Sequence, residues 1–283
     1  MAFGQNHLGG LLRCGVVCLR PPIVRRRSLK QLRKAFSDAP IDAVTPQIIA
    51  QYRDGRTAKV RANREISLLS HIYNIAREWG ITESNPAAGV RKNKEVPRDF
   101  YASAEIWSAV YAVAASELRD AMDLAYLTGQ RPADVLSMRE ADAVNEFLQV
   151  SQGKTSKKLR IRLTAAGVLN DLGALVERLI GQRRSRGVRT PYLIITEDGR
   201  QVTKPMLRLR FDDARTRAIA IAKEQGDGLL AASIRQFQFR DIRPKAASEI
   251  LDLGDASRLL GHTDKRITET VYRRVGEIVK PTR

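Results

Sequence analysis

The chain is poor in cysteine, histidine and long apolar runs, and each shortage excludes a class of protein. Cys14 and Cys18 are its only cysteines. Two cysteines cannot build a disulfide framework, and a C-x-x-x-C pair without partner ligands is a poor zinc site. No apolar run is long enough to span a bilayer, and residues 8–19 are interrupted by Arg13 and lack a clear signal-peptide cleavage site. We therefore expect a cytoplasmic protein without membrane segments.

Two kinds of catalytic machinery are also missing from the sequence. The chain has three histidines, and no group of histidine, aspartate and glutamate has the spacing of a metal site. A Gly-x-x-x-x-Gly-Lys-Ser/Thr loop, which cradles the phosphates of a nucleotide, does not occur either. The sequence gives no support to metal-assisted or ATP-driven chemistry, and we expect no cofactor.

Positive charge is what the chain has in excess. Its 283 residues include 49 lysines and arginines against 31 acidic residues, which gives a formal net charge of +18 and a pI of about 10.4. A charge of that size and sign favours a polyanionic partner, most of all nucleic acid. An anionic membrane surface, or simple solubility without a specific partner, are the alternatives.

Composition and periodicity divide the chain into four parts. Residues 1–27 contain no acidic residue and no clear period, so they are predicted to be disordered, a basic arm, or the product of a misplaced start codon. From Ser28 apolar residues recur at helical spacing, and residues 28–90 are predicted to form a small helical unit with basic side chains on its exposed faces. The charged, proline-containing residues 91–100 are typical of a linker.

Residues 101–283 are predicted to form a larger unit that is mainly helical with a small β-sheet. Strands are expected at 147–150 and 159–163, with a short further strand at 192–195. Helices are expected at 103–116, 118–128, 132–139, 165–180, 204–224, 241–252, 255–261 and 264–274. Because 43% of the residues are hydrophobic, the chain can bury a core of this size, and the predicted fold class is α+β.

Arg131 and Arg243 are each followed directly by a proline, and both are candidates for gripping a phosphate. Gly129 permits a sharp turn before Arg131, and Pro132 suits the start of a helix, where free N–H groups and the helix dipole favour an anion. Arg243 is placed similarly, with Asp241 as the expected helix cap. Two such arginines can hold phosphate oxygens by bidentate contacts, whereas either one alone is more often an ordinary surface residue.

A lysine, a histidine and a tyrosine complete this group of candidates. Lys154 lies in a predicted hairpin turn, from which it can reach a cleft as a proton donor, although Lys157 and Lys158 are close competitors. Tyr272 is a candidate nucleophile, because neighbouring positive charge favours the phenolate. His262, in a Leu-Gly-His turn, can hydrogen-bond to phosphate or move a proton. Each residue alone is more often structural, but together they indicate attack on a phosphodiester.

These motifs occur in the order seen in tyrosine recombinases, and the chain resembles the phage-type integrases of that family. The resemblance rests on Thr-Gly-Gln-Arg131-Pro, Gly-Lys154-Thr, Arg240-Asp-Ile-Arg243, Leu-Gly-His262 and Tyr272. It covers roughly residues 28–283, as a helical core-binding domain followed by a catalytic domain. The motifs are specific as a set, although each is weak alone.

The resemblance implies a mechanism for this group of residues. Tyr272 would attack the scissile phosphate, form a 3′-phosphotyrosyl link and release a 5′-hydroxyl. Arg131 and Arg243 would stabilise the pentacoordinate phosphorus. Lys154 would protonate the leaving oxygen, and His262 would contact the phosphate. Because the ester keeps the bond energy, a second strand can reverse the step without ATP or a metal.

The resemblance also implies partners. Members of the family act on double-stranded DNA as tetramers that exchange their C-terminal tails, so we expect a homo-tetramer on DNA, associated with the nucleoid. Accessory DNA-bending or directionality factors are expected as further partners. Only eleven residues follow Tyr272, so any exchanged element is expected to be short. Residues 1–27 are too short for the arm-binding domain that many phage integrases carry.

The chain departs from the pattern of the family at Arg240. The family usually has His-x-x-Arg at this motif, and arginine cannot accept a proton near pH 7. The acceptor of the Tyr272 proton is therefore open between His262, water and the phosphate itself. The spacing from His262 to Tyr272 is also one residue longer than the commonest one. Three alternatives to a recombinase follow: a DNA-binding protein on the same scaffold that no longer cuts, a topoisomerase with related tyrosine chemistry, and a generic basic structural protein.

Overall fold

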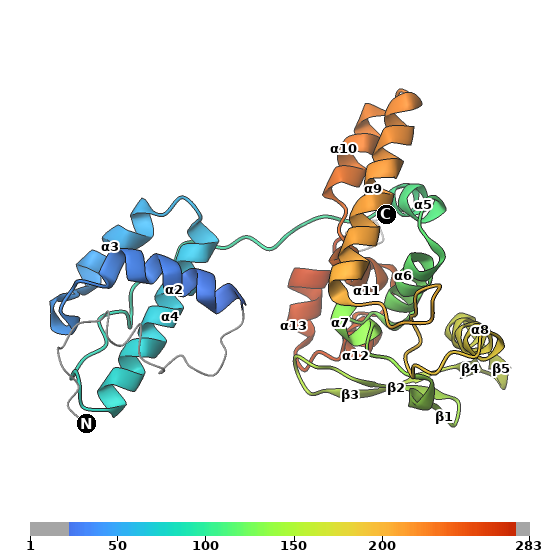
Figure 1. The fold of residues 1–283 in the computed structure, drawn as a ribbon, viewed down its shortest axis with the longest axis horizontal. Helices are drawn as coiled ribbons and strands as arrows, with labels where there is room; N and C mark the ends of the chain where they lie inside the picture. Colours follow the sequence, from blue (N-terminus) through green and yellow to red (C-terminus); the bar gives the residue numbers. More distant parts are fainter. Residues whose placement is uncertain (1–22, 276–283) are drawn as a thin grey trace, which may run out of the picture. The chain divides into compact units, whose positions relative to one another are not determined.

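The computed structural model describes residues 23–275, and the chain divides into two compact units, Met1–Val96 and Pro97–Arg283 (Figure 1). Cys14, Cys18 and most of the predicted basic N-terminal segment lie outside the described residues, as do residues 276–283. Within the described range, no helix is both long and apolar enough to cross a bilayer.

The described part of the first unit is built from the helices α2 (Ile23–Phe36), α3 (Pro46–Gly55) and α4 (Lys59–Glu78), with the short turn η2 (Ile41–Ala43) after α2. The helices enclose a core of fully buried side chains that includes Leu32, Ile49, Ile66, Leu69, Ile72 and Tyr73. Thr45 caps α3, as the sequence predicts, because its hydroxyl accepts a hydrogen bond from the Ile48 N–H at 3.3 Å.

Helix α2 begins earlier than the sequence pattern indicates. It starts at Ile23, so the interpretation of residues 1–27 as a segment outside the helices is wrong for residues 23–27. Arginine is a good helix former, and the three arginines at 25–27 add a turn to a helix whose apolar residues are already packed in the core.

Asn63 of α4 forms hydrogen bonds with the first half of residues 91–100, the segment predicted to be a linker. Its side-chain Nδ2 donates hydrogen bonds to the Asn93 carbonyl and the Glu95 carboxylate, both at 2.8 Å, and its Oδ1 accepts from the Asn93 N–H at 2.8 Å. Asn63 is buried. The first half of residues 91–100 is therefore held against α4.

The second unit is mainly helical with small antiparallel sheets, in agreement with the predicted α+β class. One sheet has the order β1-β2-β3, with β1 at Ala143–Val144, β2 at Phe147–Ser151 and β3 at Lys158–Arg162, and a separate hairpin joins β4 (Thr164–Ala165) to β5 (Val168–Leu169). The helices are α5 (Ala104–Ala112), α6 (Ser116–Thr128), α7 (Pro132–Val135), α8 (Asp171–Ser185), α9 (Lys204–Glu224), α10 (Gly228–Gln236), α11 (Ile242–Glu249), α12 (Leu253–Leu260) and α13 (Lys265–Ile267), with short turns η3 (Glu140–Asp142), η4 (Phe239–Asp241) and η5 (Thr268–Tyr272).

The sheet and the short helices of this unit meet at one place. Leu148 and Val150 of β2 are buried, opposite Ile161 and Leu159 of β3. Since β2 ends at Ser151, the strand carries the residues that follow it to the edge of the core. In Figure 1, α7, α12 and α13 lie beside the β2–β3 hairpin although they are far apart in the sequence.

Three predicted elements of this unit differ clearly from the structure, and one observed helix was not predicted. The predicted strand at 192–195 is reduced to isolated bridges at Tyr192 and Ile195. The helix predicted from residue 165 starts at Asp171, after the β4–β5 hairpin, because the Asn170 side chain accepts from the Gly173 N–H and caps it there. Residues 264–274 form the three-residue α13 and the π-type turn η5 instead of one helix. Helix α10, which the sequence analysis missed, follows a Gly-Asp-Gly stretch.

Candidate active site

Arg131 stands at the N-terminus of α7, where the Gly-Gln-Arg-Pro pattern predicts it. Helix α6 ends at Thr128, and Gly129 adopts a left-handed conformation with φ +61°. A Cβ on Gly129 would lie 3.1 Å from the Leu259 side chain, so glycine suits this turn both for its conformation and for its size. The turn thereby brings Arg131 close to the end of α12.

Arg243 is almost completely buried in α11 and is held by backbone oxygens from two other segments. It is 3% exposed. Its Nη1 donates to the Gly129 carbonyl, and its Nη2 donates to the Leu260 carbonyl at 2.7 Å. The Nε–H is also buried and has no hydrogen-bond partner among the described residues. Burial, followed by the nearby charge of Arg131, lowers the pKa of Arg243 to about 10.

Asp241 does not cap α11, contrary to the sequence-based prediction. No side-chain capping bond is present there, and the carboxylate is 1% exposed. It binds Arg98 at 2.9 Å and Arg274 at 3.0 Å, which come from the two ends of the second unit. The carboxylate also accepts from the Gln238 N–H at 3.0 Å, so the backbone donor that it binds lies before η4 and not in α11.

Tyr272 lies against both His262 and Arg243. The Tyr272 and His262 ring centroids are 4.8 Å apart, and the Arg243 guanidinium carbon is 5.2 Å from the Tyr272 centroid. Tyr272 is the last residue of η5, and its carbonyl accepts a hydrogen bond from the Ser248 hydroxyl at 3.2 Å. The geometry thus joins a phenol, an imidazole and a buried guanidinium from three separate segments.

His262 presents a lone pair, not a proton, to Arg243. The Arg243 Nη2 lies 3.3 Å from the His262 Nε2, and arginine can only donate, so this nitrogen accepts. The Nδ1 then carries the hydrogen and donates to the Thr268 hydroxyl at 2.8 Å. Burial, Arg243 and Arg131 together lower the pKa of His262 to about 4, so the ring is neutral at pH 7.

Lys154 and Arg240 lie further out than the other four predicted residues. Lys154 occupies the exposed turn after β2, and its amino group has no bond to another described residue. Arg240 is exposed and lines a groove of about 530 Å³. Further basic side chains on this groove are Lys204, Arg208 and Arg215.

A pair of glutamines, which the sequence analysis missed, links the segments of this site. The Gln152 Nε2 donates to the Gln130 Oε1 at 2.7 Å, and the Gln130 Nε2 donates to the Leu259 carbonyl at 2.9 Å. Both glutamines are buried. Their neighbours in sequence, Arg131 and Lys154, are conspicuous charges, while a buried amide carries no signal that a single sequence displays.

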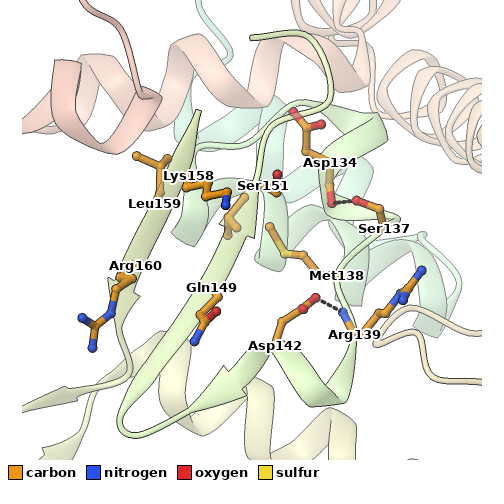
Figure 2. Close-up of a pocket in the computed structure, with 11 residues that line it drawn as sticks. Asp134, Ser137, Met138, Arg139, Asp142, Gln149, Ser151, Lys158, Leu159 and Arg160 are labelled. Carbon is orange, nitrogen blue, oxygen red and sulfur yellow. Dashed lines mark hydrogen bonds between the residues drawn. The ribbon is translucent and has the colours of Figure 1, made fainter. Parts of the chain in front are cut away.

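A second hollow lies on the β2–β3 hairpin and contains none of the residues around Tyr272. It measures about 610 Å³ and is lined by side chains of mixed charge, among them Arg139, Asp142, Lys158 and Arg160. Figure 2 shows the Asp134 carboxylate pointing away from the Gln149 and Asp142 side chains. One carboxylate oxygen of Asp134 accepts from the Gly153 N–H at 3.0 Å, and the other lies 3.8 Å from the Arg131 Nη1. Asp134 therefore belongs to the Arg131 cluster, although its backbone borders this hollow.

No group of three or more histidine, cysteine, aspartate or glutamate side chains suited to a metal ion occurs within residues 23–275.

Comparison with known proteins gives a consistent result. The model of the phage integrase family matches residues 99–277. The integrase of Enterobacteria phage 434 is 35% identical over 144 residues, which are 48% of this chain and 40% of that protein. The integrase of Escherichia phage lambda is 34% identical over 141 residues, or 47% of this chain and 39% of that protein. The matches thus span about two fifths of the length of these relatives.

Solved structures show the same fold over more of the chain. A lambda integrase tetramer bound to a Holliday junction has a TM-score of 0.76 against this structure, with 23% identity, and the match covers 99% of this chain and 81% of that one. The Tn1549 transposon integrase in complex with transposon right end DNA has a TM-score of 0.70, with 15% identity over 93% of each chain.

Proposed function

We propose, from the premise that the chain belongs to the phage integrase family, that it is a site-specific DNA recombinase which cuts and rejoins DNA through a 3′-phosphotyrosyl intermediate. The observation that carries the proposal is the packing of the Tyr272 ring against the buried Arg243 and the neutral His262. A phenol beside a fixed cation and a proton acceptor is suited to nucleophilic attack.

In the proposed step, the Tyr272 oxygen forms a bond to the scissile phosphorus and the bond to the 5′-oxygen breaks. The phenol proton goes to the His262 Nε2, to water or to the phosphate, and Lys154 protonates the departing 5′-oxygen. The His262 Nε2 is neutral and has a lone pair, which favours it among the three acceptors, and the proton transfer requires the Arg243 Nη2, 3.3 Å away, to release that lone pair. Arg240, which cannot accept a proton, would contribute charge on the outer side of the site.

Arg243 is well prepared to hold the negative charge that develops on the phosphorus. Two backbone carbonyls fix its guanidinium, while its buried Nε–H is left without a partner among the described residues. Buried donors normally find an acceptor. A phosphate oxygen would satisfy this one, and Arg131 would supply a second cation nearby.

The partners belong to the same proposal. The chain would act on double-stranded DNA, with residues 28–90 as the core-binding domain, 91–100 as the linker and 101–283 as the catalytic domain. A homo-tetramer on DNA would be the active assembly, aided by DNA-bending or directionality factors. The reaction would take place in the cytoplasm, on DNA of the nucleoid.

Covalent trapping tests the proposal directly. The wild-type chain is incubated with a library of nicked duplexes that carry a randomised core, and protein-linked DNA is recovered under denaturing conditions and sequenced. We expect a preferred core sequence from the wild type, no adduct from Tyr272→Phe, and unchanged non-covalent binding by that variant. Tyr192→Phe is the matched control, because its hydroxyl has no hydrogen bond to another described residue, and it should form adducts at the wild-type rate.

The alternative that a specific observation favours is a DNA-binding protein that no longer cuts, since Arg240 stands where the family usually has histidine. Sequence-specific binding by the wild type without any adduct would establish that alternative. Adducts that persist in Tyr272→Phe would instead move the nucleophile to another residue.

A further inference from the structure

Gln152 has a completely buried side chain whose amide makes four hydrogen bonds, to residues from three segments of the second unit. Its exposed fraction is 0%. The Nε2 donates to the Gln130 Oε1 at 2.7 Å and to the Leu260 carbonyl at 2.9 Å. The Oε1 accepts from the Thr155 hydroxyl at 2.7 Å and from the Arg131 Nη1 at 3.3 Å. The amide therefore donates two hydrogen bonds through its nitrogen and accepts two through its oxygen.

The hydrogen bonds leave one orientation for this amide. The Leu260 carbonyl can only accept, so the NH2 group must face it, and the carbonyl end then faces Arg131, which can only donate. The Gln130 Nε2 donates to the carbonyls of Thr128 and Leu259, which likewise turns the Gln130 Oε1 toward Gln152. A group with a single satisfied orientation is well suited to fix its neighbours.

Three of the proposed active-site residues depend on the contacts of Gln152. The Arg131 Nη1 donates directly to the Gln152 Oε1. The Leu260 carbonyl that Gln152 binds is the same oxygen that accepts the Nη2 of Arg243. Leu260 also precedes the Gly-His turn of His262, and a Cβ on Gly261 would lie 2.9 Å from the Gln152 Nε2.

We infer that Gln152 is a positioning residue that sets the place of Arg131 relative to Arg243 and His262, an inference that rests on the proposed recombinase function. It touches no reacting atom. Its amide binds both the Arg131 guanidinium and the Leu260 carbonyl, which also accepts from Arg243. The amide therefore fixes the distance between the guanidinium groups of Arg131 and Arg243. Thr155, which follows Lys154 in the β2–β3 hairpin, donates its hydroxyl to the oxygen of the same amide.

The test compares Gln152→Met with Gln149→Met. Methionine keeps the length and much of the volume of glutamine but makes none of the four hydrogen bonds. Gln149 lies on the same strand with an exposed side chain, so its variant controls for the substitution itself. The DNA is the core sequence recovered from the covalent trapping of the wild-type chain. Single-turnover adduct formation and non-covalent binding are measured for each variant.

We expect Gln152→Met to slow adduct formation on the order of 100-fold, because a misplacement of about 1 Å at a reacting site has that effect. Non-covalent binding should stay within about twofold of the wild type. Gln149→Met should resemble the wild type in both measurements. Equal adduct rates in Gln152→Met and the wild type would overturn the inference.

A double-mutant cycle separates positioning from general loss of stability. The rate loss from Gln152→Met is measured again in an Arg131→Lys background. If Gln152 acts through Arg131, the second loss should be at least tenfold smaller than the first, because directly coupled residues are not additive. A loss of the same size in both backgrounds would show that Gln152 acts elsewhere, and the inference would fail.

A further variant keeps the test decisive if methionine prevents folding. Gln152→Glu retains the shape, but its carboxylate cannot donate to the Leu260 carbonyl and adds a charge beside Arg131. It should also slow adduct formation, and wild-type rates in this variant would equally overturn the inference. An absence of adducts from the wild type itself would be a failure of the proposed function and not of the role of Gln152.

Discussion

The guanidinium carbon of Arg243 lies 5.2 Å from the centroid of the Tyr272 ring, and the Arg243 side chain is fixed before any DNA arrives. A cation held by backbone carbonyls does not have to reorganise when charge develops near it. The same burial that lowers the pKa of Arg243 also excludes water around its charge. Packing therefore determines the position of the buried positive charge of Arg243.

Arg243→Lys should lose most of the proposed cleavage while retaining DNA binding. A lysine has one ammonium group in place of the planar fork, so it cannot reach Gly129 and Leu260 and also present a donor to phosphate. We expect adduct formation to fall on the order of 100- to 1,000-fold. Single-turnover trapping measures this, with the exposed Arg235→Lys of α10 as the control. A rate within twofold of the wild type would remove Arg243 from the chemistry.

His262 makes the stability of the second unit depend on pH in a defined window. Its pKa is lowered to about 4 in the folded chain, whereas an unfolded histidine titrates near 6.5. Between these two values the unfolded state binds the extra proton, so this residue lowers the free energy of unfolding as the pH falls from about 6.5 to about 4. Above pH 6.5 it contributes no pH dependence.

The measurement uses Trp107, which lies in the second unit, after the other tryptophan is replaced by Trp79→Phe. Urea unfolding is followed by fluorescence at pH 7.5, 6.0 and 5.0, and His262→Gln is compared with its parent. The difference in stability between the two should shrink or reverse toward the acid end. His71→Gln, which changes an exposed histidine of the first unit, should leave the Trp107 transition unaffected. A constant difference between parent and His262→Gln would contradict the lowered pKa.

Asp241→Asn should destabilise the second unit strongly. The buried carboxylate balances Arg98 and Arg274, and asparagine would leave two cations facing each other without a counter-charge. Breaking a buried ion pair by removal of one partner costs about 3–5 kcal/mol. Asp255→Asn is the matched control, because Asp255 pairs with Arg258 on the surface, where such a pair contributes about 1 kcal/mol or less. Similar losses in the two variants, read from Trp107 fluorescence, would refute the role of Asp241.

Arg274 connects that prediction to Tyr272. Arg274 lies two residues after Tyr272, the proposed nucleophile. Its backbone N–H donates to the Ser248 hydroxyl at 2.8 Å, and its side chain pairs with Asp241. Asp241→Asn should therefore slow adduct formation even at temperatures at which the variant is fully folded.

The sequence predicted those parts of the fold and the site that depend on local signals. The turn at Gly129 and the helix start at Pro132 are local, and the structure has both. Arg131, Arg243, His262 and Tyr272 were assembled from a motif order, and the structure brings them together.

The remaining features depend on contacts between distant segments. The roles of Gln130 and Gln152 come from their hydrogen bonds to the end of α12, which is distant in the sequence. The role of Asp241 likewise comes from its ion pairs with Arg98 and Arg274, which lie near the two ends of the second unit. The strand predicted at 192–195 fails for the same reason. Its apolar residues Leu193 and Ile194 are buried in the core, but within residues 23–275 the segment pairs only through isolated bridges at Tyr192 and Ile195.

Gly261→Ala should disturb the site more than its backbone conformation alone explains. Gly261 has φ +68°, and an added Cβ would lie 2.9 Å from the Gln152 Nε2. Gly226 has φ +78° with nothing within 4 Å of the equivalent position, so Gly226→Ala measures the conformational strain alone, about 1–2 kcal/mol. The unfolding free energy of Gly261→Ala should fall by more than that of Gly226→Ala, and only Gly261→Ala should slow adduct formation, because it displaces the amide that holds Arg131. Equal effects of the two substitutions on both measurements would mean that the close approach of Gly261 to Gln152 has no bearing on the site.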